Sequence, residues 1–276
     1  MTIYLGSTFA TYNYYANNNA SAMKEASADP QISNATKYYE ENIGKVKSVD
    51  DFVSNYRLFS YAMTAYGLSD MVYAKAMMTK VLNSDLSDSS SFANKLTDTR
   101  FTNFAKAFSE LGSTTSSTDT TTSGDTTTGD TTDTTSTAAT TAEVVSAYLE
   151  QSVEDSLGQT DQGVQLALYF KRTASTVSSA YGLLADSALW KVVQTVYGLP
   201  ANLGSMELET QKSVVESKFD VADLQDPEKV EKLLKRFTVL WDATENAASD
   251  PILQLFGVGS SSSSSSGGGA EVLTLF

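Results

Sequence analysis

The chain contains no cysteine and no histidine among its 276 residues. Without cysteine there is no disulfide and no thiolate nucleophile, and without histidine there is no imidazole base to activate a serine or a thiol. The ordinary zinc sites, which use these two residue types as ligands, are excluded for the same reason. We therefore expect no metal site and no cofactor, and carboxylates remain as the plausible acid–base groups.

Positive charge and long apolar runs are also scarce. The chain has 19 lysine and arginine residues against 33 acidic ones, which gives a formal net charge of -14. Nucleic-acid-binding proteins normally present clustered basic residues to the phosphates, so a nucleic-acid partner is not expected. No apolar run approaches the roughly 20 residues that span a bilayer, so membrane insertion is not expected either.

Composition divides the chain into segments. Residues 1–28 are polar, lack the pattern of a cleaved secretory signal and show no capped helical pattern before Met23. Residues 113–141 are rich in Thr, Ser and Asp and cannot offset the entropy of ordering, so they are predicted to be a disordered linker. The predicted organisation is a polar segment 1–28, a first helical half 29–112, the linker 113–141, a second helical half 142–258, and a Ser/Gly tether with an apolar tail over 259–276. That tail is either a docking peptide or a disordered end.

Helical periodicity dominates the sequence that lies between these segments. Apolar residues make up 41% of the chain and recur at helical spacing, whereas the alternation typical of strands is hard to find. The strongest helix begins at Pro227 after the N-cap Asp226. Its outer face is predicted to carry two i,i+4 ion pairs, Glu228 with Lys232 and Glu231 with Lys235. Further helices are predicted to open at Asp29-Pro30 and Asp250-Pro251 and to cover 71–82, 99–111, 141–153 and 162–170. These patterns predict an all-α fold.

The tripeptide Tyr-Gly-Leu occurs three times, at 66–68, 181–183 and 197–199. Ahead of the first copy, spacings of four and three predict one amphipathic helix that starts at the N-cap Ser48 and buries Phe52, Tyr56, Phe59, Met63 and Tyr66. Gly67 can adopt the left-handed conformation that ends a helix, and Leu68 can fold back on the last turn. Because no phosphate-loop motif surrounds any copy, we interpret Tyr-Gly-Leu as a helix stop.

The repeated tripeptide also indicates an internal duplication. Sliding Leu58 onto Leu189 aligns LFSYAMTAYGLS with LWKVVQTVYGLP. Further on, DLSDSSSF at 85–92 resembles DLQDPEKV at 223–230, and each is predicted to precede a helix, although the shift between the copies changes. The sequence thus predicts two related helical halves.

Three pairs of neighbouring carboxylates are the candidates for acid–base chemistry: Glu40 and Glu41, Asp50 and Asp51, and Asp85 and Asp88. Each pair has a simpler role, on a polar helix face, at a helix start and in a serine-rich loop respectively. The stretch 85–96 superficially resembles a calcium loop, but Ser90 stands where the bending glycine belongs and Leu96 where the bidentate glutamate belongs. We therefore predict no calcium site there.

Two arginines and three methionines are candidates for binding. Arg57 and Arg172 could hold a buried carboxylate or a ligand, and a sticky groove could be lined by Met71, Met77 and Met78. Surface ion pairing and core filling explain these residues more simply. No catalytic, cofactor-binding or metal-binding residue is assigned from the sequence.

A series of motifs carries a resemblance to a known family. SVDDF, RLFSYAMTAYGL, KVL, SFANKLTDTRF and FAKAF follow one another closely in the first half, and QLALYFKRTA, AYGLLAD, VYGLPANLG and LQDPEKVEKLLKRFTVLWD follow in the second. Together they resemble the bacterial family called domain of unknown function 1217, over nearly all of the chain except the Thr-rich insertion and the termini. The resemblance implies a largely helical protein whose genes tend to lie among flagellar genes, and it implies no established activity.

From this resemblance we expect a non-enzymatic, flagellum-associated helical interaction protein, structural or assembly-related, whose partners are flagellar proteins. The polar N-terminus is compatible with uncleaved flagellar export, so a location at the flagellum is expected. One alternative is a cytoplasmic adaptor or flagellar export chaperone. Another is an enzyme that uses carboxylates only, which a deep pocket with converging buried carboxylates would favour.

Overall fold

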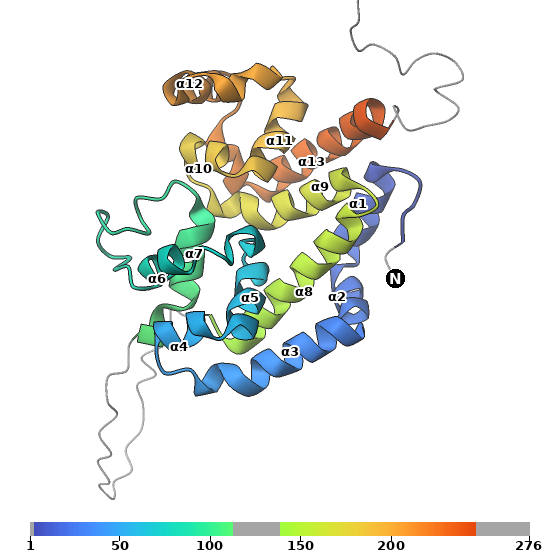
Figure 1. Ribbon diagram of the computed structural model, residues 1–276. Coiled ribbons are helices and arrows are strands. Elements are labelled where there is room, and N and C mark those ends of the chain that lie inside the picture. Colours follow the sequence, from blue (N-terminus) through green and yellow to red (C-terminus); the bar gives the residue numbers. More distant parts are fainter. Residues whose placement is uncertain (1–2, 113–138, 247–276) are drawn as a thin grey trace, which may run out of the picture.

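A computed structural model of the chain describes residues 3–112 and 139–246. Within these residues the chain forms thirteen α-helices and no strand, which confirms the predicted all-α fold (Figure 1). None of these helices combines the length and the apolar character needed to cross a membrane.

The helices divide into seven before residue 113 and six after residue 138. The first seven are α1 (Thr8–Asn17), α2 (Asn19–Ser27), α3 (Pro30–Asn42), α4 (Val49–Ser54), α5 (Tyr56–Ala65), α6 (Lys75–Leu82) and α7 (Thr99–Ala107). The other six are α8 (Thr141–Gly158), α9 (Gln162–Thr173), α10 (Ala180–Ala185), α11 (Ser187–Tyr197), α12 (Leu208–Lys218) and α13 (Pro227–Trp241). Short helical turns lie between them: η1 (Ile43–Lys45), η2 (Ser69–Met71), η3 (Ser109–Gly112), η4 (Ala174–Thr176), η5 (Ala201–Ser205), η6 (Val221–Gln225) and η7 (Asp242–Asn246).

Helices α8 and α9 form the centre of the molecule (Figure 1). α8 packs against α2, α3 and α5, and α9 packs against α1, α11 and α13. Tyr148 of α8 stacks on Tyr61 of α5 with ring centroids 3.8 Å apart. Because α8 belongs to the second predicted half, its packing against α3 and α5 brings the two predicted halves into direct contact.

Two stretches of the chain fold in the same way. In the first, η1, α4 and α5 follow α3, and in the second, η4, α10 and α11 follow α9. The shift that aligns the predicted duplicates also aligns the N-cap Ser48 with Ser179 and the N-cap Asn55 with Asp186. In each copy a serine side chain caps a helix of 6 residues, and an Asn or Asp side chain caps the longer helix after it. The order of elements and the caps thus match the predicted duplication over 43–68 and 174–199, which we call the repeated unit.

Both copies of the repeated unit end in the predicted helix stop. Gly67 has a φ of 68° and Gly198 a φ of 61°, in the left-handed region that glycine adopts without strain. In each copy the N–H of the following leucine donates to the carbonyl five residues earlier, at 2.8 Å from Leu68 and 2.9 Å from Leu199. These bonds define a Schellman motif, so the prediction is confirmed at both positions.

The third Tyr-Gly-Leu, at 181–183, is not a stop, and the prediction is wrong there. Gly182 lies inside α10, where its N–H donates to the side chain of the N-cap Ser179 at 3.2 Å. The alignment of the repeated unit places Gly182 on Asp51, in the first turn of α4, and not on Gly67. The tripeptide therefore ends a helix only where a full helix precedes it.

The single helix predicted ahead of Gly67 is two helices. Asn55, between α4 and α5, has φ -78° and ψ 92°, outside the helical region, and its side chain accepts the N–H of Leu58 at 3.3 Å. The break rotates the apolar face, so Tyr56 is 62% exposed although it was predicted to be buried, whereas Phe59 is fully buried. Asparagine is a strong N-cap, and its capping bond overrides the continuous helical spacing.

Helix α13 starts as predicted, but one of its ion pairs is missing. The side chain of Asp226 accepts the N–H of Glu228 at 2.9 Å, and the apolar face is buried. The pair Glu231–Lys235 forms at 3.8 Å. No ion pair joins Glu228 and Lys232 in the described residues, so that prediction is wrong.

The second sequence match does not extend the repeat. Residues 85–92 form turns, held by the side chains of Asp85 and Asp88, whereas 223–230 lead directly into α13. The helix predicted to follow the first match starts only at Thr99. The duplication therefore cannot be traced through this match.

The N-terminal segment is part of the packed structure, contrary to the prediction of a segment without a capped helix. Ser7 caps α1 through its side chain. Tyr12 is fully buried against the second half, and its hydroxyl donates to Glu231 at 2.9 Å. The carboxylate of Asp242 accepts the N–H of Thr8 at 2.7 Å. These contacts fix α1 on α9 and α13.

The end of the predicted linker 113–141 also belongs to the fold. The N–H of Ala139 donates to the carbonyl of Ala107 at 2.9 Å, and Thr140 caps α8 through a capping box with Glu143. Three predictions lie outside the described residues: the linker over 113–138, the helix from Asp250 and the segment 259–276.

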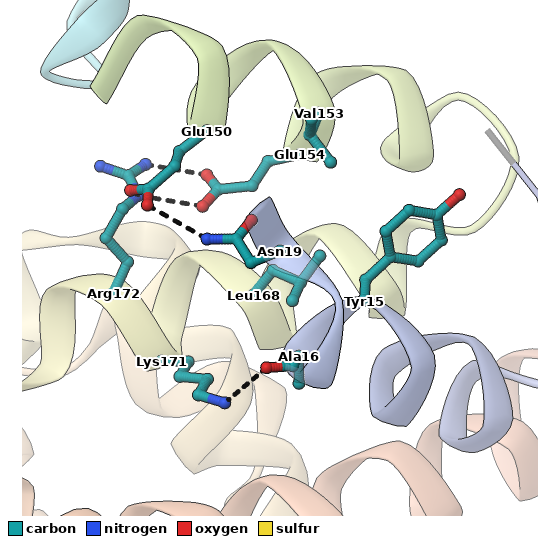
Figure 2. Close-up of a pocket in the computed structure, with 9 residues that line it drawn as sticks. All are labelled: Tyr15, Ala16, Asn19, Glu150, Val153, Glu154, Leu168, Lys171 and Arg172. Atoms are coloured by element: carbon teal, nitrogen blue, oxygen red, sulfur yellow. Dashed lines mark hydrogen bonds and ion pairs between the residues drawn. The ribbon is translucent and has the colours of Figure 1, made fainter. Parts of the chain in front are cut away.

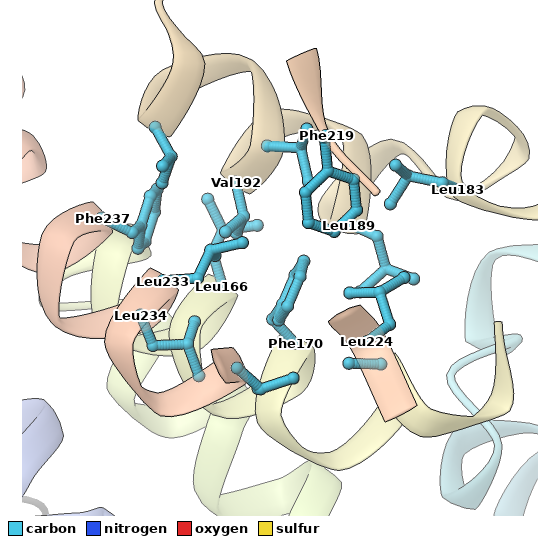
Figure 3. Packing of buried hydrophobic residues seen from close by; sticks show 14 of the residues in the cluster. Leu166, Phe170, Leu183, Leu189, Val192, Phe219, Leu224, Leu233, Leu234 and Phe237 are labelled. Atoms are coloured by element: carbon cyan, nitrogen blue, oxygen red, sulfur yellow. The ribbon is translucent and has the colours of Figure 1, made fainter. Parts of the chain in front are cut away.

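The described residues form two main hydrophobic cores, one from α3 to α7 with Val144 of α8 and one from α9 to α13 with Tyr12 of α1. The core of the first half is a net of aromatic rings, in which Phe52 contacts Phe59, Phe104 and Phe108 with centroids between 4.9 and 6.5 Å apart. In the second half, leucine and valine side chains of α11 and α13 surround Phe170 of α9 (Figure 3). These two cores fix the positions of the helices that carry the polar pockets described below.

Candidate functional site

A pocket of about 270 Å³ opens where α1 and α2 meet α8 and α9 (Figure 2). Two carboxylates from α8 and two cationic side chains from α9 gather on its wall: Glu150, Glu154, Lys171 and Arg172. The glutamates lie one helical turn apart, so both face the same side of α8. The rest of the wall includes Tyr15, Val153 and Leu168.

The most buried polar contact of this pocket is between Glu154 and Arg172. Arg172 donates from Nε and Nη2 to the two carboxylate oxygens of Glu154, at 2.9 and 2.8 Å, and from Nη2 to Gln151 at 2.7 Å. Glu154 is 4% exposed. Burial raises the pKa of the Glu154 carboxyl, and Arg172 opposes that rise. A bidentate pair of this kind fixes the geometry of both side chains.

The other charged groups of the pocket tie helices together. The side chain of Asn19, on α2, donates to Glu150 at 3.1 Å, and Arg172 lies 3.9 Å from the other oxygen of Glu150. Lys171 donates to the carbonyl of Ala16 at 3.4 Å, at the end of α1 (Figure 2). The pocket therefore links the N-terminal helices to α8 and α9.

A second pocket, of about 450 Å³, lies between the halves beside the first helix stop. Arg100 of α7 donates from Nη1 to the carbonyl of Gly67 at 2.7 Å, and it pairs with Asp98 through Nη2 at 2.7 Å. Across the pocket the hydroxyl of Tyr169 donates to Asp186 at 2.7 Å. Burial raises the pKa of Tyr169, and the nearby carboxylate of Asp186 raises it further, so the phenol stays a neutral donor.

The three carboxylate pairs predicted as candidates do not come together. Glu40 and Glu41 lie on α3, Asp50 and Asp51 in the first turn of α4, and Asp85 and Asp88 in the loop after α6, and all six are exposed. Hydrogen bonds from Ser87 lower the pKa of Asp85. No group of three or more acidic side chains in residues 3–112 and 139–246 is arranged as a metal site.

The arginine and methionine candidates divide differently. Arg172 binds the buried carboxylate of Glu154, a role that the sequence analysis ranked below surface ion pairing. Arg57 lies over the ring of Tyr38, with its guanidinium carbon 3.6 Å from the ring centroid. The methionines pack in or against the core of the first half, as core filling predicts: Met71, Met77 and Met78.

Sequence reasoning missed the buried carboxylates, which are Asp98, Glu154, Asp161 and Asp186. The three aspartates are the N-caps of α7, α9 and α11, so an N-cap signal before an apolar run could have found them. Glu154 follows the buried Val153 and precedes the buried Leu157 by three positions. A glutamate at that spacing on an apolar helix face is the signal that was available.

Comparison with known proteins finds a family and a solved structure. Residues 65–230 match the sequence model of a family described as "Protein of unknown function (DUF1217)". The crystal structure of protein AGR_C_984 from Agrobacterium tumefaciens is similar to this chain, with 37% sequence identity and a TM-score of 0.70, over 85% of this chain and 93% of that chain. None of the curated proteins matches the chain.

Proposed function

This chain belongs to the DUF1217 family, and from that premise we propose that it is a non-enzymatic, flagellum-associated helical interaction protein with a structural or assembly role. The family description assigns no activity. The resemblance of its motifs to proteins whose genes lie among flagellar genes suggests the cellular system. The arrangement of its buried polar groups supports a structural or assembly role.

The observation that carries the proposal is the part played by the buried carboxylates. Within the described residues, Asp98, Asp161 and Asp186 each cap the N-terminus of a helix, and Glu154 is clamped by Arg172. A catalytic acid or base must reach its substrate and exchange a proton with it. Three of these carboxylates also bond to a second helix, Asp161 to Thr8, Asp186 to Tyr169 and Glu154 to Arg172. A protein whose helices are fixed in this way can present a rigid surface to other proteins.

The loss of the protein tests the proposal. We expect a clean deletion strain of a flagellated bacterium that carries this gene to swim poorly or to assemble flagella incompletely, and we expect the wild-type gene to restore both. Normal swimming and normal filaments in that strain would contradict the flagellar role. Fractionation then locates the protein, because a protein found only in the cytoplasm would favour the adaptor or export-chaperone alternative.

Export through the N-terminal segment is tested by a short truncation. Removing residues 2–28 would remove α1 with the buried Tyr12, so a failure to export would only report misfolding. Removing residues 2–6 keeps the N-cap Ser7 and all of α1. If the protein is exported through this end, the short truncation should stay in the cell and remain folded, with a small fall in melting temperature from the lost bonds of Ile3 to Tyr15 and Leu5 to Thr11.

The alternative of a carboxylate enzyme rests on Glu150 and Glu154, which share one pocket as a catalytic pair would. Glu150→Gln separates the two functions, because the amide oxygen can still accept the hydrogen bond from Asn19. A catalytic role predicts a folded protein that no longer complements the deletion strain. The interaction role predicts normal complementation.

A further inference from the structure

A groove of about 370 Å³ lies on the second half, between the end of α11, the end of α12 and α13. Its floor is apolar and includes Tyr197, Phe219, Leu224 and Leu233. The rings of Tyr197 and Phe219 lie 5.6 Å apart. In the first copy of the repeated unit the equivalent residue is Tyr66, and there the rings of Phe104 and Phe108 approach to 5.6 and 6.0 Å. The tyrosine of the second copy instead borders an open groove.

The rim of this groove is basic, although the protein as a whole is acidic. Lys229, Lys232 and Arg236 line it from α13, and Asp223 is the one carboxylate among its lining residues. Asp223 is already bound to Lys229. The groove thus carries an excess of positive charge in a chain whose formal net charge is -14.

Two of these cations lack an acidic partner. Lys232 and Arg236 lie one turn apart on α13, and neither forms an ion pair within the described part of the chain. The sequence predicts that Lys232 pairs with Glu228, but the pair is not formed. Arg236 lies over the ring of Tyr197, 5.9 Å from its centroid. Two exposed cations therefore flank an aromatic floor.

We propose that this groove docks an acidic segment of a partner protein. An apolar side chain of that segment lies over Tyr197 and Phe219, and its carboxylates pair with Lys232 and Arg236. The apolar contact supplies affinity, and the charge-assisted pairs fix the register. Because the rest of this acidic chain repels an acidic partner, the groove also sets the orientation in which the two proteins meet. This inference rests on the proposed interaction function and names the chemistry of the partner.

A phage-displayed library of random peptides, selected on the full chain, tests the groove. We expect the enriched peptides to combine Asp or Glu with Leu, Phe or Trp. A fluorescein-labelled enriched peptide should then bind the double variant Lys232→Glu/Arg236→Glu at least about tenfold more weakly than the wild type. Lys235→Glu is the control for a single charge reversal, because Lys235 is an exposed cation of the same helix that does not line the groove; the reversal also removes its exposed ion pair with Glu231. Its effect should be small beside that of Lys232→Glu alone.

Several results would overturn the proposal. They are the absence of any enriched peptide, enrichment of peptides without carboxylates, and binding that is unaffected by the double variant. Equal weakening by Lys235→Glu and Lys232→Glu would show general charge attraction and would also overturn it. Circular dichroism and melting of each variant confirm that the exposed substitutions leave the fold intact.

The test separates this inference from the proposed function. The peptide selection does not involve the flagellum, so normal swimming of a deletion strain would refute the flagellar role and leave the groove result standing. Conversely, a deletion strain that swims poorly but is fully restored by the Lys232→Glu/Arg236→Glu variant, with no enriched peptide, would refute the groove and leave the flagellar role standing.

Discussion

The two copies of the repeated unit share a backbone but differ in what surrounds it. Both end in a left-handed glycine followed by a leucine that folds back on the helix. At Gly67 a Cβ atom would lie 3.5 Å from the ring of Tyr169 and 3.8 Å from the side chain of Arg100. At Gly198 a Cβ atom would meet nothing within 4 Å. The first stop is a contact between the halves, and the second is a surface turn.

The polar partners of the two stops differ in the same way. The carbonyl of Gly67 accepts a charge-assisted bond from Arg100, whose side chain is 22% exposed and paired with Asp98. Near the second stop, the side chain of Gln194 donates to the carbonyl of Pro200 at 3.2 Å on the exposed surface. Local chemistry therefore places the stop, and tertiary packing decides how much stability depends on it.

The largest effect is expected from Gly67→Val. The β-branched side chain resists a positive φ, and its methyl groups extend beyond the Cβ position into Tyr169 and Arg100, so we expect a loss of about 4 kcal/mol. Gly198→Val suffers only the backbone strain, about 2 kcal/mol. Urea unfolding with a check for an unchanged slope measures both. Equal losses would show that the packing around Gly67 contributes nothing.

The next largest effect is expected from Arg100→Ala. It removes the donor to the carbonyl of Gly67 and leaves the 9% exposed Asp98 without its cation, which should cost about 2 kcal/mol. Gln194→Ala is the matched change at the second stop, and it should cost less than about 0.5 kcal/mol because the bond is exposed. Similar losses from the two alanine variants would remove the distinction between a buried and a surface stop.

The sequence could place most helix ends because caps are local. Ser48, Asp226 and the two glycine stops each act through bonds to residues within one or two turns. It could not place the break at Asn55, because a cap and a continuous apolar stripe favour different outcomes at that position and the spacing alone does not show that the capping bond prevails.

The candidate site was beyond the sequence for a different reason. Arg172 and Glu154 are 18 positions apart and meet only because α8 and α9 pack side by side. Nothing in the spacing of either helix specifies that crossing. The hydrogen bond of Tyr12, on α1, to Glu231 could not be predicted for the same reason, because the two residues are 219 positions apart and meet only through helix packing.

A smaller effect of opposite sign is expected at the third Tyr-Gly-Leu. Gly182 lies in α10, where a Cβ atom would make contacts of 3.4 to 3.6 Å with side chains and would need no positive φ. Gly182→Ala should therefore stabilise the protein by about 0.5 kcal/mol through helix propensity and the loss of unfolded-state freedom. Gly67→Ala should destabilise it. A lower melting temperature in both Gly182→Ala and Gly67→Ala would mean that the Tyr-Gly-Leu at 181–183 is also a constrained turn.

The smallest effect is expected from replacing residues 113–138, which lie between the two copies of the repeated unit. We replace residues 113–138 by a short Gly-Ser segment and keep Ala139 and the cap Thr140, which belong to the fold. Ala139 donates to Ala107, five residues before the first attachment point, so this bond already holds the end of the loop on the fold, and shortening the loop should change the free energy of unfolding by less than about 0.5 kcal/mol. A variant that also deletes residues 139–141 is the control and should lose the capping box and about 1 kcal/mol more. A large fall in melting temperature from the shorter deletion would show that the stability of the protein depends on residues 113–138, and not only on the packing of the helices.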